Sequence, residues 1–370
     1  MVRHYDIDWL RVIAIALLLV YHVAICFQPW APMLGFISSG KPWLSLWLPM
    51  TMLNIWRIPL LFFVSGMGVY LAMKNRPVVE LLKERALRIL IPFLFGAVAI
   101  VPLHILIWRY HNGLTPGYGV DSGHLWFLWN VACYVVLLSP LFYLIRRNQS
   151  GKTVENMQKF FARPWGLLLV WSLFIAEVLL LNPIPYELYA KTTHGFVVGL
   201  LAFASGFLFM LSGEGFFTLI TKIKWFLLAI AIGLFAIRVS GLPNIPFAPV
   251  RLVIESQAWI TCALAFGHSY LRRPGRTLRY LSLAAYPVYI MHMVFLFLGG
   301  TLIFKLDIDV RLQFVLLLSF TLVGCLAFFE FVIRRIGIVG VLFGYKAPRT
   351  KGVYAPPNGE LAVTESESHN

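Results

Sequence analysis

Arg11 and His22 share the first apolar stretch of the chain, at a spacing that places two chemically active side chains on one helix face. Eleven residues of α-helix turn through about 1100°, so these side chains lie about 20° apart around the axis and roughly 16.5 Å apart along it. Asp8 lies three residues before Arg11, close enough to pair with it. A deep histidine on the same stripe as a boundary arginine indicates a polar function rather than packing.

A second histidine, His292, follows the sequence Tyr286-Pro287-Val288-Tyr289-Ile290-Met291 in a later apolar stretch. It lies about ten residues into that stretch, or near 15 Å of helical rise, which matches the depth of His22. Tyr289 precedes it by three residues and is placed to orient it. Pro287 frees backbone carbonyls, which membrane helices tolerate only against protein or water. The two histidines are therefore predicted to share one polar cavity.

Other ionisable residues also fall inside apolar stretches, where a charged group costs about 2.5 to 3.5 kcal/mol on insertion scales and is a functional hypothesis by default. Arg57 has no acidic neighbour in sequence and needs a tertiary partner or a substrate oxygen. Arg251 and Glu255 have the spacing of a helical ion pair, yet both are expected at the outer mouth of a cavity. Glu177 and Glu330 are interpreted as structural.

Arg85 and Arg88 are three residues apart before the third apolar stretch, so two guanidinium forks suited to phosphate groups are predicted on one helix face. The alternative is that they only mark the cytoplasmic boundary. His124 and Trp126 open the fourth stretch, where tryptophan is also typical of a membrane interface. The four cysteines stand singly without a CxxC pair, so neither a metal site nor a disulfide framework is predicted.

The composition of the chain indicates the class of protein whose helices must position these residues. Hydrophobic residues make up 59% of its 370 residues and charged residues 13%, against roughly 25% charged in a soluble domain. This excludes a cytosolic enzyme, a disordered chain and a secreted disulfide scaffold. It predicts an all-α integral membrane protein in the lipid bilayer, with about ten helices around a central polar cavity. The ten apolar stretches, of about 20 residues each, begin near Val12, Leu46, Ile89, Leu125, Trp165, His194, Trp225, Leu252, Ser282 and Leu312.

The distribution of basic residues predicts the orientation, because cytoplasmic connections carry the excess of lysine and arginine. Of the 31 lysines and arginines, one set of alternating connections holds only Lys41, Arg57, Arg109, Lys191, Arg238, Arg251, Lys305 and Arg311. The other set is therefore cytoplasmic, as are both termini. The net charge of +15 is then explained by basic residues that set the orientation in the membrane, and no nucleic-acid partner is expected. Residues 1–345 form the membrane domain, and 346–370 a flexible cytoplasmic tail.

Taken together, these motifs resemble the family 3 membrane acyltransferases. The resemblance covers about residues 5 to 345, in family order, and rests on Asp8-Trp9-Leu10-Arg11 with His22, Phe62-Phe63-Val64-Ser65-Gly66, Arg85 and Arg88 with Pro92, His124-Leu125-Trp126-Phe127-Leu128, and Tyr289 with His292. Within that family, the segment Gly123–Trp129, Glu255-Ser256, Gly267-His268 and Phe343-Gly344-Tyr345-Lys346 are similar to the branch that succinylates periplasmic glucans.

The resemblance implies an enzyme of the bacterial inner membrane that takes an acetyl or succinyl group from cytoplasmic acyl-coenzyme A. The acceptor is a hydroxyl of an extracytoplasmic glycan or polysaccharide. No permanently bound cofactor is expected. His22 carries over as the catalytic residue, and Arg85 and Arg88 as the residues that bind the nucleotide end of the coenzyme. Whether the chain forms a homo-oligomer stays open.

Acyl transfer needs a base for the attacking hydroxyl and donors for the developing oxyanion, and imidazole suits the first task near neutral pH. The preferred mechanism has His22 deprotonate the glycan hydroxyl; a covalent acyl-histidine is the alternative. Arg11 would line the route of the coenzyme, and Arg57, Tyr289 and His292 would lie near the acceptor or oxyanion. The predicted substrate-binding residues at the outer mouth are His124, Trp126 and Glu255.

Three other functions stay open from the residues alone. A transporter or glycan flippase also needs polar groups at mid-depth and broken helices, although no internal repeat is visible. A non-catalytic sensor or scaffold would neither bind nor hydrolyse acyl-coenzyme A. A membrane-bound O-acyltransferase of the other large class would not be expected to carry the spacing of Arg11 and His22.

Overall fold

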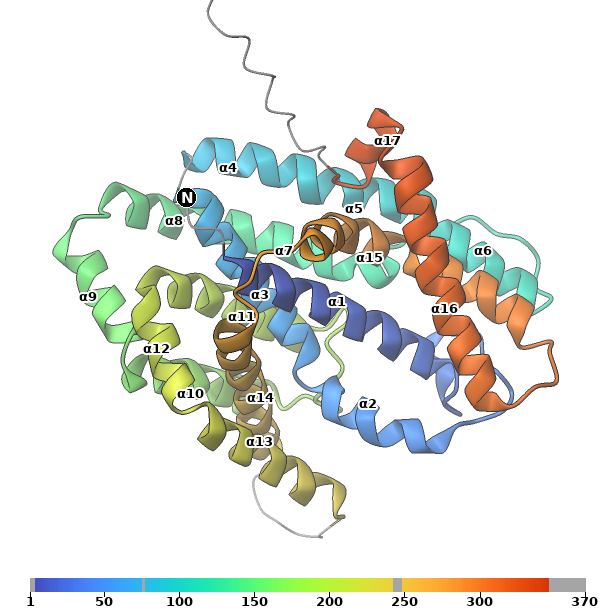
Figure 1. The fold of residues 1–370 in the computed structure, drawn as a ribbon, viewed down its shortest axis with the longest axis horizontal. Coiled ribbons are helices and arrows are strands. Elements are labelled where there is room, and N and C mark those ends of the chain that lie inside the picture. Colours follow the sequence, from blue (N-terminus) through green and yellow to red (C-terminus); the bar gives the residue numbers. More distant parts are fainter. Residues whose placement is uncertain (1–3, 75–76, 242–247, 346–370) are drawn as a thin grey trace, which may run out of the picture.

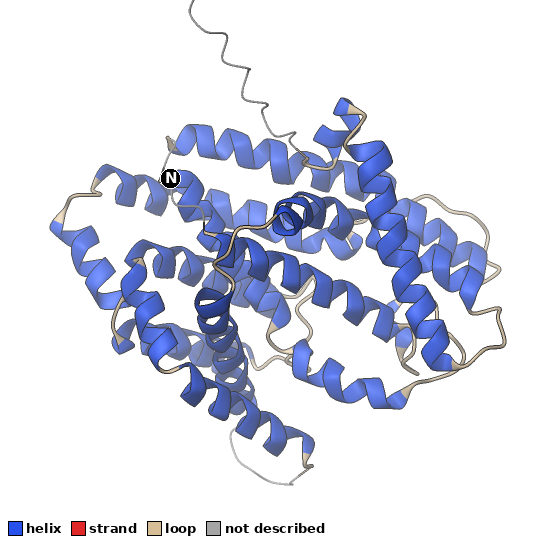
Figure 2. Ribbon diagram, viewed as in Figure 1, coloured by secondary structure: helices blue, strands red, loops and turns tan. Residues whose placement is uncertain are grey.

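The described part of this protein, a computed structural model, comprises residues 4–74, 77–241 and 248–345. Every regular element within those ranges is helical (Figure 1; Figure 2), so the predicted all-α class is confirmed. The predicted tail at 346–370 lies outside the described residues, as do Pro243 and Pro246 after the seventh apolar stretch.

Seventeen α-helices follow one another along the described ranges. In chain order they are α1 (Tyr5–Ile25), α2 (Trp47–Asn54), α3 (Arg57–Met73), α4 (Val78–Arg85), α5 (Ile91–Phe95), α6 (Val101–His111), α7 (Trp126–Leu137), α8 (Ser139–Arg147), α9 (Lys152–Phe161), α10 (Pro164–Leu181), α11 (Thr193–Ser212), α12 (Glu214–Lys222), α13 (Lys224–Val239), α14 (Ala248–Tyr270), α15 (Arg276–Ile303), α16 (Val310–Phe328) and α17 (Gly337–Leu342). Short 3-10 or π-helical turns extend some of them, among them Ala86–Leu90 between α4 and α5.

Seven described helical segments are long and apolar enough to cross a membrane, or nine if two bent pairs each count as one span. The bent pairs are α7 with α8, at 45°, and α12 with α13, at 60°; they correspond to the predicted fourth and seventh spans. The predicted eighth span, α14, is not among these seven segments or the bent pairs. It buries Glu255, Gln257 and His268 inside the bundle. The chain is thus a multi-pass membrane protein, while the count of ten and the cytoplasmic termini stay predictions.

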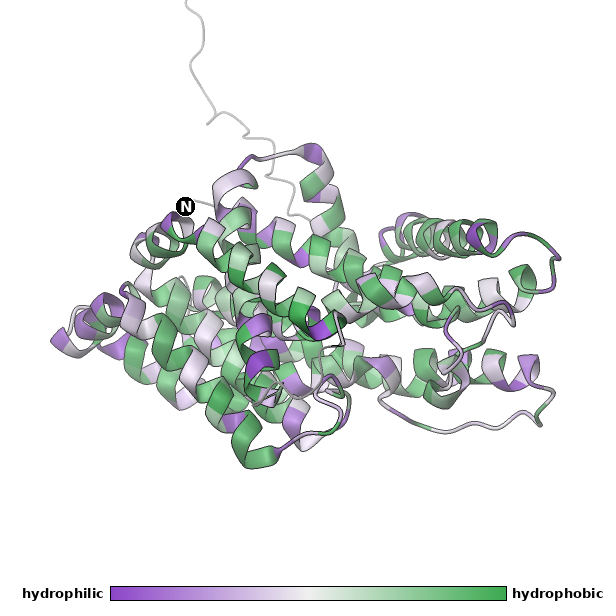
Figure 3. Cartoon of the chain, turned by 90° about the horizontal axis from the view of Figure 1, so that it is seen from below, coloured by the Kyte–Doolittle hydropathy of each residue, from purple (hydrophilic) through white to green (hydrophobic). Residues whose placement is uncertain are grey.

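Large apolar side chains cover the outside of the bundle. Val136, Leu180 and Val323 are 65%, 82% and 64% exposed, an arrangement suited to lipid rather than water. Hydrophobic residues run along the outer helices, and hydrophilic residues gather mainly toward helix ends and connecting loops (Figure 3). The residues that do chemistry must therefore meet inside the bundle.

Helix α1 runs through the middle of the bundle (Figure 1), where it packs against α3, α14 and α15. At its first turn, His268 Nδ1 of α14 lies 2.9 Å from Asp6 Oδ2, which ties the two helices together. Helix α3 packs closely on α11, because a Cβ at Gly66 would overlap the Phe203 carbonyl. This close contact fixes the helix that carries Arg57.

Candidate active site

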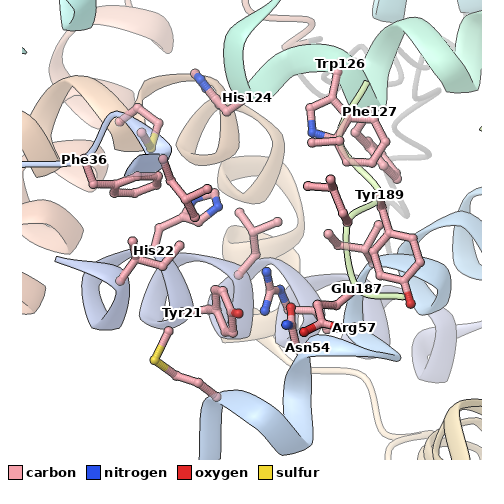
Figure 4. A pocket seen from close by; sticks show the side chains of 18 of the residues that line it. Tyr21, His22, Phe36, Asn54, Arg57, His124, Trp126, Phe127, Glu187 and Tyr189 are labelled. Atoms are coloured by element: carbon pink, nitrogen blue, oxygen red, sulfur yellow. The ribbon is translucent and has the colours of Figure 1, made fainter. Parts of the chain in front are cut away.

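A cavity of about 650 Å³ lies between α1, α2, α3, α7, α15 and the loop at 182–192. Its lining includes five of the residues selected from sequence, namely His22, Arg57, His124, Trp126 and Tyr289. Figure 4 shows His22, Arg57, His124 and Trp126 around this space. Segments distant in sequence therefore converge on one cavity, which His22 lines, whereas His292, predicted to share it, is not among the lining residues.

His22 and His292 are in direct contact. His22 Nδ1 lies 2.8 Å from His292 Nε2, and the two rings are nearly parallel. On its other side, His292 Nδ1 lies 2.6 Å from the Tyr289 carbonyl oxygen. His292 is only 1% exposed and is not among the residues that line the cavity, whereas His22 lines it. It is therefore placed to orient His22 rather than to touch a substrate.

This chain of contacts determines which nitrogen of His22 carries the lone pair. A carbonyl oxygen can only accept, so His292 Nδ1 must donate to Tyr289. In a neutral ring, Nε2 of His292 is then an acceptor, and His22 Nδ1 must donate to it. The lone pair of His22 is left on Nε2, the nitrogen free to take a proton from a molecule in the cavity.

Two further histidines extend the cluster. His124 Nε2 lies 3.1 Å from the Ile290 carbonyl, and the Tyr289 hydroxyl donates to the His124 carbonyl at 2.6 Å. The His124 ring lies 5.0 Å from that of His292 and 5.5 Å from that of His104. His104 lines the cavity but was not predicted, because nothing but its place in an apolar stretch marked it. Within the described ranges, no three His, Cys, Asp or Glu side chains are grouped as metal ligands.

Arg57 is the first residue of α3 and is 3% exposed. Its Cζ lies 3.3 Å from the centre of the Tyr21 ring, a close cation–π contact. Its Nε and Nη1 have no hydrogen-bond partner in the described part of the chain. The tertiary partner that the sequence required is thus an aromatic face, and part of the guanidinium is left for a molecule in the cavity.

The arginines predicted to bind the coenzyme separate into two environments. Arg85 Nη2 donates to the Gly68 carbonyl at 3.3 Å, and a Cβ on Gly68 would come within 3.1 Å of Arg11 Nη2. Arg11 and Arg85 therefore converge on the same point of α3. Arg88 instead pairs with Glu84 at 3.3 Å. Glu84 lies four residues before Arg88, the ordinary spacing of a helical ion pair.

Glu255 takes a different place from the one expected at the mouth of the cavity. Its two carboxylate oxygens accept from Arg238 at 2.7 and 2.8 Å, and Arg238 also bonds to the Thr51 carbonyl. Glu255 is 1% exposed and does not line the cavity. Its carboxylate is taken up by an arginine of α13 rather than by Arg251, so we leave it out of the proposed site.

The loop at 182–192 contributes cavity residues that the sequence did not reveal, including Glu187, Tyr189 and Lys191. An irregular loop has no periodic sequence pattern, and only the tertiary structure shows that it lines the same cavity as α1. Lys191 Nζ lies 2.7 Å from Asp121 Oδ1 and lowers the pKa of that carboxyl. Glu177 Oε1 lies 2.7 Å from His194 Nδ1, which supports the structural role given to Glu177.

Comparison with known proteins identifies the family of this chain. The chain matches the model of the acyltransferase 3 family, described as an acyltransferase domain, over residues 4–330. No curated protein and no solved structure matches the chain. The match covers most of the sequence, including His22 and every other residue that lines the cavity. The chain therefore belongs to the family 3 acyltransferases.

Proposed function

We propose that this protein transfers an acetyl or succinyl group from cytoplasmic acyl-coenzyme A to a hydroxyl of an extracytoplasmic glycan, with His22 as general base. The observation that carries the proposal is the chain from the Tyr289 carbonyl through His292 to His22. It holds an imidazole in one tautomer with its lone pair available to the cavity, which is the state a general base requires.

The reaction balances without a further reactant. His22 Nε2 takes the proton of the glycan hydroxyl while the hydroxyl oxygen attacks the thioester carbonyl. The tetrahedral intermediate collapses, the carbon–sulfur bond breaks, and the proton passes from His22 to the departing thiolate. The products are the ester and free coenzyme A, and His22 returns to its neutral form. In the protonated intermediate, His292 Nε2 still accepts from His22 Nδ1 and so stabilises the imidazolium.

The two substrates would approach from opposite ends of α1. Arg11 and Arg85 converge on Gly68 near one end, where charge-assisted hydrogen bonds to the phosphates of the coenzyme are favoured. His22 lies roughly 16.5 Å further along the helix axis, a separation that suits the extended arm carrying the thioester. Arg57, which stacks on Tyr21, and the loop at 182–192 also line the cavity, and we assign them to the acceptor. We place the enzyme in the bacterial inner membrane.

The test uses the purified full chain in lipid vesicles with labelled acetyl- or succinyl-coenzyme A and a neutral oligosaccharide acceptor. Mass spectrometry of the oligosaccharide detects the ester directly. His22→Ala is expected to lower the transfer rate by at least the 10² to 10⁴-fold that a general base contributes. The matched control is His111→Ala, at the end of α6 and outside the cavity. Undiminished transfer by His22→Ala would remove His22 from this role.

Two further measurements separate the alternatives. Single-turnover reaction without acceptor, followed by mass spectrometry of the protein, detects an acyl-histidine if His22 acts as the nucleophile. Movement of an unmodified glycan across the vesicle membrane, without ester formation, would instead identify a transporter or flippase.

A further inference from the structure

One part of the cavity holds a polar cluster whose individual contacts with the acceptor the transfer mechanism does not specify. Arg57, Asn54 and Glu187 all line the cavity, and their polar ends gather in the same region (Figure 4). Among the described residues, Arg57 and Glu187 form no ion pair, although they carry opposite charges. Arg57 is 3% exposed with two unpartnered nitrogens. A buried guanidinium in that state is costly unless a molecule supplies oxygen atoms.

A break between two helices presents two members of this cluster. Helix α2 ends at Asn54 and α3 begins at Arg57. The Ile55 carbonyl in the break accepts from the Tyr189 hydroxyl and from the Ser256 hydroxyl, both at 2.8 Å. The break is therefore held by α14 and by the loop at 182–192. Asn54 and Arg57 flank it and reach the cavity from a fixed piece of backbone.

The third member, Glu187, is carried by a loop that is fastened on both sides. His194 binds Glu177 Oε1 at 2.7 Å through Nδ1 and the Tyr186 carbonyl at 2.9 Å through Nε2. Lys191, which lines the cavity, joins the loop to Asp121 at 2.7 Å. A loop held in this way can present a carboxylate at a defined position: the Glu187 carbonyl accepts from Tyr189 N at 3.0 Å, while its exposed side chain makes no hydrogen bond to the described residues.

The charges and walls of this part of the cavity favour a neutral polyhydroxyl ligand. A guanidinium fork donates to two neighbouring oxygens, a carboxylate accepts from two neighbouring hydroxyls, and an amide does both. A free phosphate or carboxylate would gain from Arg57 but would be repelled by Glu187. Trp30, Trp47 and Trp126 also line the cavity and offer flat apolar faces to the carbon–hydrogen face of a sugar ring.

We propose that Asn54, Arg57 and Glu187 bind adjacent hydroxyls of the acceptor sugar and thereby select which hydroxyl reaches His22. This inference rests on the proposed transfer to a glycan and names the residues that give it regiospecificity. Asn54 and Glu187 contact the acceptor only, so their loss should affect recognition of the acceptor and leave the donor unaffected.

The experiment compares Glu187→Gln and Asn54→Leu with wild type in the full chain. For each we measure the KM for a set of neutral oligosaccharides differing in linkage, the KM for acyl-coenzyme A, and the position of the ester by tandem mass spectrometry. We expect the acceptor KM to rise about 5- to 150-fold, the range for losing a hydrogen bond to a buried or charged group. The donor KM should stay unchanged, and the ester should spread to other hydroxyls. Glu155→Gln, on the exposed face of α9, is the matched control.

A binding measurement separates this inference from the proposed function. Oligosaccharide affinity is measured in His22→Ala protein, with and without Glu187→Gln, so that turnover is not required. Weaker binding caused by Glu187→Gln supports the subsite even if wild type transfers no acyl group. Equal affinity with an unchanged ester position overturns the subsite even if transfer is established. A change in donor KM alone would overturn it as well, because it would assign the cluster to the coenzyme.

Discussion

The orientation of His22 by His292 can be tested with a graded set of substitutions. His292→Phe removes the acceptor for His22 Nδ1 while keeping a ring in a site that is 1% exposed. The buried N–H of His22 is then left without a partner, at a cost of about 1 to 3 kcal/mol. The imidazole is expected to rotate or change tautomer to recover a partner. The fraction of protein with a lone pair on Nε2 should fall by the corresponding factor, about 5- to 150-fold.

Two polar substitutions distinguish orientation from simple packing. In His292→Gln the amide oxygen occupies the position of Nε2 and can still accept from His22. In His292→Asn the amide occupies the position of Nδ1 and keeps only the contact with the Tyr289 carbonyl. We therefore expect kcat to follow the order wild type, Gln, Asn, Phe, with His292→Phe about 5- to 150-fold below wild type.

The assay is steady-state transfer to the oligosaccharide, with kcat, both KM values and the thermal unfolding midpoint measured for each variant. A positioning role predicts loss in kcat with both KM values preserved and with folded protein present. Equal kcat in all four proteins would refute the tautomer argument. Loss of kcat that parallels loss of the unfolding midpoint, with no advantage of Gln over Asn, would assign His292 to packing alone.

Three further outcomes follow from other contacts. Gly68→Val should displace Arg11 and Arg85 and raise the KM for acyl-coenzyme A about tenfold, the equivalent of one charge-assisted hydrogen bond. The control Gly233→Val, at a glycine with open space around it, should leave this KM unchanged. Equal KM values for the two variants would exclude a coenzyme site at Gly68. Gly66→Val should overpack the contact of α3 with α11 and lower the free energy of unfolding by about 1 to 3 kcal/mol or more. The measurement is the denaturation midpoint, which should fall. A variant as stable as wild type would contradict the close packing. Lys191 lowers the pKa of Asp121, so their ion pair should persist at every pH above the ordinary Asp pKa of about 3.9 and be lost only as the pH falls through the lowered pKa. The protection of backbone amides at 182–192 against hydrogen exchange should therefore stay constant between pH 5 and 8. A change in protection within that range that Asp121→Asn abolishes would contradict the lowered pKa of Asp121.

The properties that depend on local spacing could be predicted from sequence. Hydrophobic content determined the membrane class, and the fixed rise and rotation of a helix placed Arg11 and His22 on one face. The same arithmetic predicted that His292 lies at the depth of His22, and the two rings are in contact. These predictions hold because helix geometry is set by the backbone and does not depend on the neighbours of the helix.

Partners that come from distant segments could only be found in the tertiary structure. His22 and His292 are 270 positions apart, and no spacing rule reveals that one fixes the tautomer of the other. Glu255 was expected beside Arg251 but is bound by Arg238, because a helix neighbour competes with every cation that packing brings nearby. Glu187 and Lys191 lie in a loop without periodicity, so their place at the cavity follows from how Glu177, His194 and Asp121 hold that loop. Sequence fixes the depth of a side chain along its own helix, whereas the packing of helices decides what that side chain meets.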